Sequence, residues 1–144
     1  MARSFQVTFD AADPGALARF WAEVLGYVVE PPPDGYATWD AFAESVGIPE
    51  EDRGRYSAAV DPGGTGPRLF FQRVSEPKAA KNRVHLDVNA SGDAGVPVEE
   101  PRHRVDREAR RLAGHGAAVL EEHEEHGGYW VVMQDPEGNE FCLQ

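Results

Sequence analysis

Two stretches of alternating apolar and polar residues, each followed by an amphipathic helix, constrain the fold of this chain more than any other feature. The central stretch, residues 83–89, carries Val84, Leu86 and Val88 between His85, Asp87 and Asn89. Residues 5–10 repeat the pattern, with Phe5, Val7 and Phe9 as the apolar members. Because successive side chains of a strand point to opposite faces, the apolar set is predicted to enter a core and the polar set to face away from it. We therefore expect two halves that are built alike.

The helix after each alternating stretch is predicted from its apolar spacing and its boundary residues. Asp13 and Pro14 suit an N-cap and a first helical position, and Gly26 ends the first helix. The apolar residues between them recur every three or four positions and are Leu17, Phe20, Trp21, Val24 and Leu25. A second helix is expected over about 102–113, where Val105, Ala109 and Leu112 share one face.

Three further strands are expected after each helix, so the fold class is α+β with the order β-α-β-β-β occurring twice. An extra helical segment over about residues 38–53 interrupts the first copy. On this prediction, residues 1–144 form a single domain, with one module over 1–75 and the other over 82–144. Length fits this, because compact domains usually hold about 100–150 residues.

Charge and cysteine content exclude several classes of function. A formal net charge of −11 would repel nucleic acid and anionic membrane surfaces and would attract a cationic ligand. Cys142 is the one cysteine, so no disulfide forms within the chain, as is usual in a reducing cytoplasm. No apolar run approaches the roughly 18 residues that span a bilayer. We expect a cytoplasmic protein that binds neither nucleic acid nor membrane.

Three motifs together resemble a known superfamily. They are the helix segment 13–26 (DPGALARFWAEVLG), the strand 84–88 (VHLDV) and the turn 135–141 (DPEGNEF). These motifs resemble those of the vicinal oxygen chelate superfamily, which includes glyoxalase I, bleomycin-resistance proteins and extradiol dioxygenases. The chain is most similar to the small bacterial glyoxalase-like proteins. The resemblance implies two βαβββ modules whose curled mixed sheet encloses a cup, with helices outside, polar strand faces inside, and a homodimer.

The resemblance also implies where a divalent metal would lie. Members that use a metal take ligands from the first, fourth, fifth and eighth strands, and the matching positions here are Gln6, Gln72, His85 and Cys142. Glu140 lies two residues before Cys142 on the same strand face, and a register slide of one pair would make His85 and Glu140 the ligands. Because Gln6 and Gln72 offer only neutral amide oxygens, the ligand set favours the absence of a metal over its presence. The sequence does not identify any other cofactor.

His85 and Glu140 are the two candidate catalytic residues. An imidazole on a pocket wall can act as a base, a ligand or a hydrogen-bond partner, but His85 can equally be a histidine satisfied by Asp87. Glu140 has a structural alternative, in which its carboxylate accepts backbone amides near the 135–138 turn. Cys142 fits a small buried thiol better than a nucleophile.

The candidate pocket residues come from the polar faces of the predicted strands. They are Gln6, Thr8, Asp10, Gln72, Asp87, Trp130 and Cys142. Asp10 and Asp87 occupy equivalent places in the two modules, so they are predicted either to form an acid/base pair or to end exposed strands. Trp130 is predicted to line the pocket or to belong to the core.

The function predicted from these residues is binding of a small organic molecule in a cup-shaped pocket. Proton transfer by His85 would give lyase or isomerase chemistry of an unassigned reaction. The alternative is a non-catalytic protein that sequesters a drug or metabolite, as bleomycin-resistance proteins do, and the missing anionic ligands favour it. Stoichiometric metal lost on His85→Ala would discriminate the two.

Overall fold

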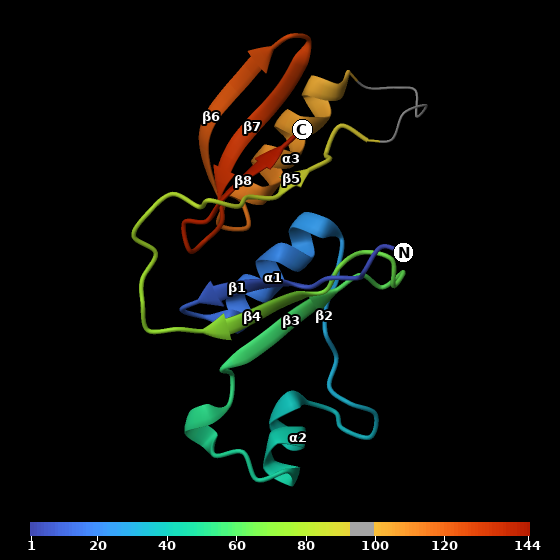
Figure 1. The fold of residues 1–144 in the computed structure, drawn as a ribbon, viewed down its shortest axis with the longest axis vertical. Helices are drawn as coiled ribbons and strands as arrows, with labels where there is room; N and C mark the ends of the chain where they lie inside the picture. The colour runs from blue at the N-terminus through green and yellow to red at the C-terminus, as the bar shows by residue number, and fades with distance from the viewer. Residues whose placement is uncertain (93–99) are drawn as a thin grey trace. The chain divides into compact units, whose positions relative to one another are not determined.

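The computed structural model describes residues 1–92 and 100–144, which divide into two compact units, Met1–Pro77 and Lys78–Gln144. Each unit contains one four-stranded mixed sheet and one long helix that follows the first strand of that sheet (Figure 1). The prediction of an α+β fold built from two βαβββ modules is confirmed, as is the extra helix in the first module. The single curled sheet is not: the strands form two separate four-stranded sheets, because β4 pairs with β1 and β8 pairs with β5, each within its own unit.

The first unit contains β1 (Val7–Ala11), α1 (Pro14–Leu25), β2 (Val28–Val29), β3 (Tyr56–Val60) and β4 (Leu69–Arg73). The sheet order is β1-β4-β3-β2, and β1 runs parallel to β4 while the other pairs are antiparallel. Helix α1 packs on one face, where the Phe9 ring lies 5.1 Å from those of both Trp21 and Phe71. As predicted, the Asp13 carboxylate caps the helix by accepting the Ala16 N–H at 3.0 Å.

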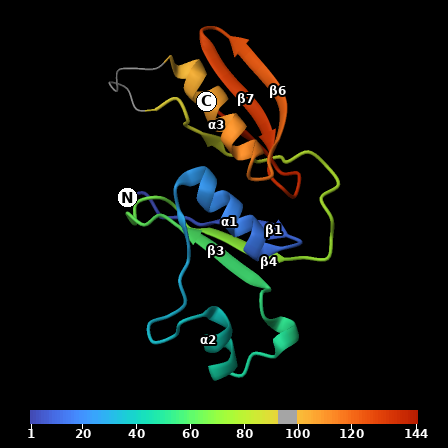
Figure 2. The same cartoon turned by 180° about the vertical axis from the view of Figure 1, so that it is seen from behind.

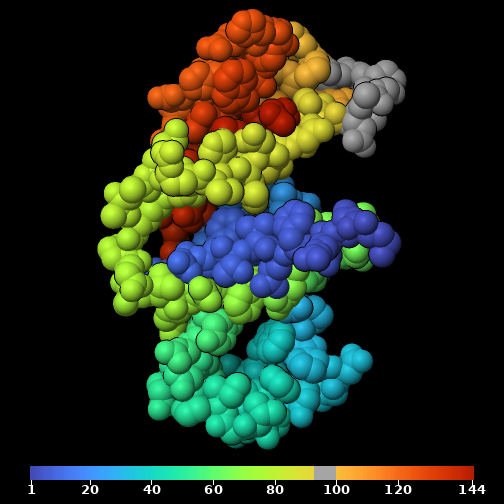
Figure 3. All heavy atoms as spheres, viewed as in Figure 1, coloured from blue at the N-terminus to red at the C-terminus, as the bar shows by residue number. Residues whose placement is uncertain are grey.

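The insertion between β2 and β3 consists of α2 (Trp39–Ser45) and the short 3₁₀ helix η1 (Glu50–Asp52). It forms a lobe of its own within the first unit, drawn from light blue to green in Figure 3. The Thr38 hydroxyl caps α2 through the Ala41 N–H, and the Trp39 indole N–H donates to the Glu30 carbonyl at 2.8 Å. Only Ala43 of α2 is buried, so the lobe adds little to the core of the unit.

The second unit contains β5 (Asp87–Val88), α3 (Pro101–Ala113), β6 (Ala118–Glu125), β7 (Gly128–Gln134) and β8 (Glu140–Leu143). Its sheet order, β5-β8-β7-β6, repeats that of the first unit, with β5 parallel to β8. Helix α3 covers one face of this sheet (Figure 2). The core between them consists of buried residues from both layers, Val105, Ala109, Leu112, Val131, Met133, Phe141 and Leu143.

Two apolar residues that alternation assigns to the core are exposed instead. Val84 is 81% exposed and Phe5 is 70% exposed, because each lies before the paired part of its strand. Strand β5 comprises two residues, Asp87 and Val88, which pair with Cys142 and Leu143 of β8. Alternation identifies which side a residue faces, but pairing with a partner strand decides which residues enter the sheet.

The turn between β7 and β8 is held by Asp135, which is 3% exposed. One of its carboxylate oxygens accepts the backbone N–H groups of Glu137 and Asn139 at 2.9 Å, and the other accepts the Asn139 side-chain amide at 2.8 Å. The structural role predicted for Glu140 at this turn therefore belongs to Asp135. Among the residues described, no helix is long and apolar enough to cross a membrane.

Candidate functional site

Three side chains of the predicted site meet on the face of the second sheet that points away from α3. Asp87 on β5 is directly opposite Cys142 on β8, and His85 precedes Asp87 by two residues. One ligand-type atom from each of these three residues lies within 4.8 Å of the other two. His85 Nδ1 is 3.2 Å from Asp87 Oδ1, and both side chains are more than two-fifths exposed. The cluster thus combines an imidazole, a carboxylate and a thiol that solvent can reach.

The Cys142 thiol is kept protonated by its surroundings. Burial raises its pKa to about 11, and the negative charge of Asp87 and a hydrogen bond from the thiol to that carboxylate add to the shift. Lys81 acts in the opposite direction without reversing it. Since the thiolate is the nucleophilic form, the structure favours a hydrogen-bond donor here over a nucleophile.

Glu140 is engaged outside this cluster. Its carboxylate accepts the backbone N–H of Asn82 at 2.9 Å and pairs with the Lys78 ammonium at 3.1 Å. Burial opposes ionisation, but these bonds outweigh it and lower the pKa of Glu140 to about 2. Glu140 is therefore an ionised group that fastens the 78–82 segment to β8, which suits positioning better than proton transfer.

Trp130 lies on the same sheet face as Cys142. Cys142 is opposite Val132 on β7, and Trp130 precedes Val132 by two residues. The Trp130 ring stacks on the His123 ring, with 5.2 Å between centroids and 15° between planes. His123 also contacts Glu121 at 3.0 Å. An aromatic pair thus adjoins the cluster on this face.

The other predicted site residues lie in the first unit and bond to one another. Gln6 accepts from Arg68 at 2.8 Å, and its amide lies 3.4 Å from the Thr8 hydroxyl. Gln72 donates to Asp10 at 2.8 Å across the β1–β4 pair. These polar side chains therefore satisfy one another's hydrogen bonds. Gln6 and Gln72 act in this unit as neutral hydrogen-bonding groups.

Arg68 is a polar residue of the first unit that the sequence does not predict as part of the site. Its guanidinium makes two hydrogen bonds to Glu30, at 2.5 and 3.0 Å, and lies 5.1 Å from the centre of the Phe70 ring. Phe70 in turn stacks on Tyr56. Glu30 follows β2, Tyr56 lies on β3, and Arg68 and Phe70 belong to the β4 segment, so no local sequence pattern signals the association of Arg68 with Glu30.

The donor set of the second unit can be tested against the metal that the superfamily resemblance implies. Imidazole nitrogen, carboxylate oxygen and thiolate sulfur are the ligand types of zinc and similar borderline divalent cations, and three protein ligands leave a position open for substrate. The mutual distances of at most 4.8 Å allow one ion to reach all three. His85, Asp87 and Cys142 therefore fit a borderline divalent cation, whereas the magnesium ion prefers an all-oxygen set.

Comparison with known proteins shows which family the chain matches. The glyoxalase-like domain family matches residues 6–144. A search of curated proteins found no match. Among solved structures, a glyoxalase/bleomycin resistance protein/dioxygenase family enzyme from Burkholderia phytofirmans PsJN is 18% identical, with a TM-score of 0.59, over 96% of this chain and 94% of that one.

Two further structures share the fold. A possible glyoxalase from Bacillus cereus is 15% identical, with a TM-score of 0.61, over 100% of this chain and 99% of that one. A variant of the fosfomycin resistance protein FosX from Listeria monocytogenes, complexed with Mn(II) and 1S,2S-dihydroxypropylphosphonic acid, is 11% identical, with a TM-score of 0.62, over 100% and 90%. Likeness at these identities shows the fold alone. Because the family match spans nearly the whole chain, this protein belongs to the glyoxalase-like domain family.

Proposed function

We propose that this protein binds a small organic molecule on the sheet face around His85, Asp87 and Cys142 and acts on it by proton transfer, as a lyase or isomerase. The observation that supports the proposal is the approach of the three ligand-type atoms to within 4.8 Å of one another in a chain of the glyoxalase-like family. Partly exposed polar groups that meet on one face are available to a ligand from solvent.

His85 is the proton-transfer residue in this proposal. In the tautomer whose Nδ1–H donates a hydrogen bond to Asp87, Nε2 has the free lone pair and accepts a proton from the substrate. Asp87 orients the ring and stabilises the imidazolium that forms. The Cys142 thiol donates a hydrogen bond to Asp87 and so holds that carboxylate in place. Glu140 positions the chain that precedes β5 rather than touching the substrate.

In an alternative, metal-bound form of the site, a divalent cation held by His85, Asp87 and Cys142 would supply Lewis-acid polarisation of a substrate oxygen, and His85 would then be a ligand and not the proton acceptor. Coordination requires the thiolate, so cation binding must displace the Cys142 proton and becomes stronger as pH rises. The FosX variant, which has the same fold, is complexed with Mn(II), and this supports a metal-bound form of this protein.

Cobalt titration of the full chain, purified without a histidine tag, tests the metal ligands. Thiolate ligation of Co²⁺ gives a near-ultraviolet charge-transfer absorption, and we expect it in the native protein and not in Cys142→Ser or His85→Ala. His103→Ala, which changes an exposed histidine of α3, serves as the matched control and should keep the band. Absence of the band in the native protein would show that these residues do not hold a metal.

Proton transfer is tested by deuterium exchange. A panel of small carbonyl compounds in D₂O is followed by proton NMR, and we expect the protein to accelerate exchange next to the carbonyl of at least one compound. His85→Ala should remove that acceleration, because the proton acceptor is lost. Equal exchange with the native and His85→Ala proteins would contradict the proposed role.

Non-catalytic sequestration is the second candidate, and the first unit favours it. Gln6 and Gln72 are neutral and already bonded to Arg68 and Asp10, so this unit contributes no anionic ligand from those positions. The acidic chain would attract a cationic drug over a long range. Thermal stabilisation by metal-free bleomycin, together with no exchange of any carbonyl compound, would support sequestration over catalysis.

A further inference from the structure

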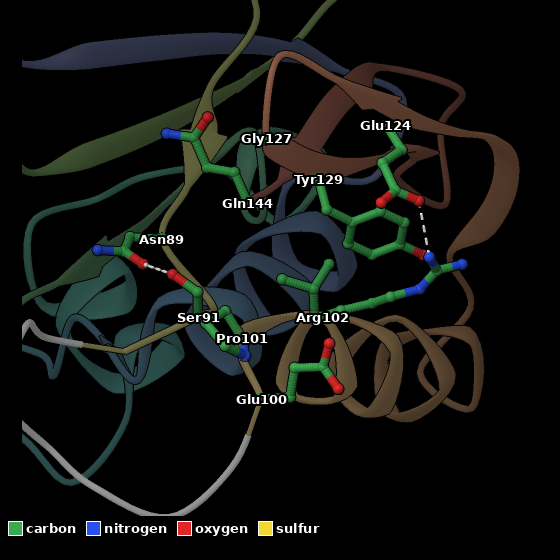
Figure 4. Close-up of a pocket in the computed structure, with 11 residues that line it drawn as sticks. Asn89, Ser91, Glu100, Pro101, Arg102, Glu124, Gly127, Tyr129 and Gln144 are labelled. Atoms are coloured by element: carbon green, nitrogen blue, oxygen red, sulfur yellow. Dashed lines mark hydrogen bonds and ion pairs between the residues drawn. The ribbon is translucent and has the colours of Figure 1, made fainter.

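A pocket of about 510 Å³ lies in the second unit, on the side of the sheet that carries α3. It is separate from the cluster of His85, Asp87 and Cys142, which occupies the opposite face. Residues from the start of α3, the β6–β7 hairpin, the segment after β5 and the residue after β8 line it (Figure 4). Its volume is in the range of sites that hold small organic molecules.

One wall of the pocket is a fixed assembly of three side chains. The Arg102 guanidinium lies 4.6 Å from the centre of the Tyr129 ring and makes a 2.8 Å ion pair with Glu124 (Figure 4). The Tyr129 hydroxyl donates to Asp106 on α3. Burial and this hydrogen bond raise the pKa of Tyr129 to about 12, so the ring stays neutral. This wall presents an aromatic surface with a cation that already has its counter-ion.

The opposite wall is held by backbone bonds. Ser91 donates its backbone N–H to the Gln144 carbonyl at 3.0 Å and its hydroxyl to Asn89 at 3.0 Å. Arg104 donates to the Ser91 carbonyl at 3.0 Å. Asn89, Ser91 and Gln144 therefore form a pinned edge of the pocket, and the side-chain amides of Asn89 and Gln144 point away from Tyr129 (Figure 4).

The charges that line the pocket do not balance. Arg102 and Glu124 neutralise each other, which leaves the carboxylate of Glu100. Within residues 1–92 and 100–144, that carboxylate has neither an ion pair nor a side-chain hydrogen bond, and it does not cap α3. The whole chain carries a net charge of −11, which raises the local concentration of cations further.

We propose that this pocket is a second binding site, for a small organic cation whose ammonium group pairs with Glu100 and whose apolar part lies against Tyr129 and Val105. Val105 is 1% exposed and forms the apolar floor. The Tyr129 ring provides flat apolar surface that favours an aromatic or alkyl group. An anion of the same shape would meet Glu100 and Glu124 and is expected to bind more weakly.

Three probes of matched shape test the site on the full chain at low ionic strength. They are phenethylamine, 2-phenylethanol and phenylacetate, each titrated to about 10 mM, where ligands with millimolar dissociation constants are detected. The readout is the shift of the amide NMR signals of Ser91, Gly127 and Gly128. We expect phenethylamine to bind and the other two to bind at least about threefold more weakly, as for a partly exposed ion pair.

Glu100→Gln keeps the size of the side chain and removes its charge, so it should weaken phenethylamine binding by about threefold or more. Glu125→Gln, on exposed β6 and outside the pocket lining, is the control and should leave the affinity within about twofold. Phenethylamine binding that Glu100→Gln leaves unchanged would overturn the proposal. So would tighter binding of phenylacetate, which would make Arg102 the anchor, or no shift with any probe.

Discussion

At the scale of single residues, Asp87 connects the candidate site. Its carboxylate lies 3.2 Å from His85 Nδ1 and accepts a hydrogen bond from the Cys142 thiol, so one carboxylate binds both an imidazole and a thiol. Alternation in the sequence predicts that these residues face the same way. It does not predict that Asp87 rather than Glu140 joins His85 in the cluster, because that depends on the β5–β8 register and on where Lys78 lies.

Alkylation of Cys142 tests the electrostatics of this cluster. Since burial and Asp87 raise the pKa of the thiol to about 11, we expect its reaction with iodoacetamide at pH 8 to be about tenfold or more slower than that of a free cysteine. Asp87→Asn should lower the pKa and speed the reaction at that pH. The signal is unambiguous because the chain has one cysteine.

The control is Glu125→Gln, which changes an exposed carboxylate of β6 in the same unit and should leave the alkylation rate unchanged. A pH profile with its midpoint near 8.5, the value of an unperturbed thiol, would contradict the described surroundings of Cys142.

At the scale of elements, the helices follow from the sequence more closely than the strands. The caps and apolar spacing of α1 and α3 are local properties, so Asp13, Gly26 and the Val105 face are all found where the sequence predicts them. Strand β5 is shorter than alternation suggests, because only Asp87 and Val88 pair with β8, and pairing with a strand distant in the sequence leaves no local pattern. Asp135 precedes a proline–glycine turn, and an acidic residue at that position is a recognisable signal for turn capping.

Glu140 links the segment before β5 to β8, and its pKa predicts how that link depends on pH. Because the pKa is lowered from 4.5 to about 2 in the folded state, the stability that it contributes is fully present above about pH 4.5 and is lost as pH falls through 2. Glu140→Gln should therefore lower the urea midpoint at pH 7 and have little effect near pH 2.

The corresponding control is Glu125→Gln, which alters an exposed carboxylate of the same sheet and should leave the midpoint nearly unchanged at both pH values. A destabilisation by Glu140→Gln that is equal at pH 7 and pH 2 would indicate lost packing rather than a lost ionic link.

At the scale of the whole molecule, the repeated βαβββ order is the feature that the sequence predicts best. Two alternating stretches and two helices predict it, and both units show the same strand order. The polar associations within each unit, such as that of Arg68 with Glu30, could not be predicted because they join side chains distant in sequence.

The resemblance to the superfamily leads us to propose a homodimer. Each sheet ends in a strand with exposed apolar residues, Val28 and Val29 on β2 and Val119 and Leu120 on β6, and a second copy would shield such surface from water. Sedimentation equilibrium should give twice the chain mass of 15.8 kDa. A mass of 15.8 kDa at micromolar concentration would rule the dimer out.

The lobe between β2 and β3 has a consequence for engineering. Its two ends meet in an antiparallel pair, where Val29 lies opposite Ala59 and Glu30 donates to the Ala58 carbonyl. Neighbouring antiparallel strands need only a few residues to connect them, so the sheet sets no requirement on how long this connection is. A reporter peptide grafted into the lobe, or a shorter linker in its place, should therefore leave the rest of the first module able to assemble.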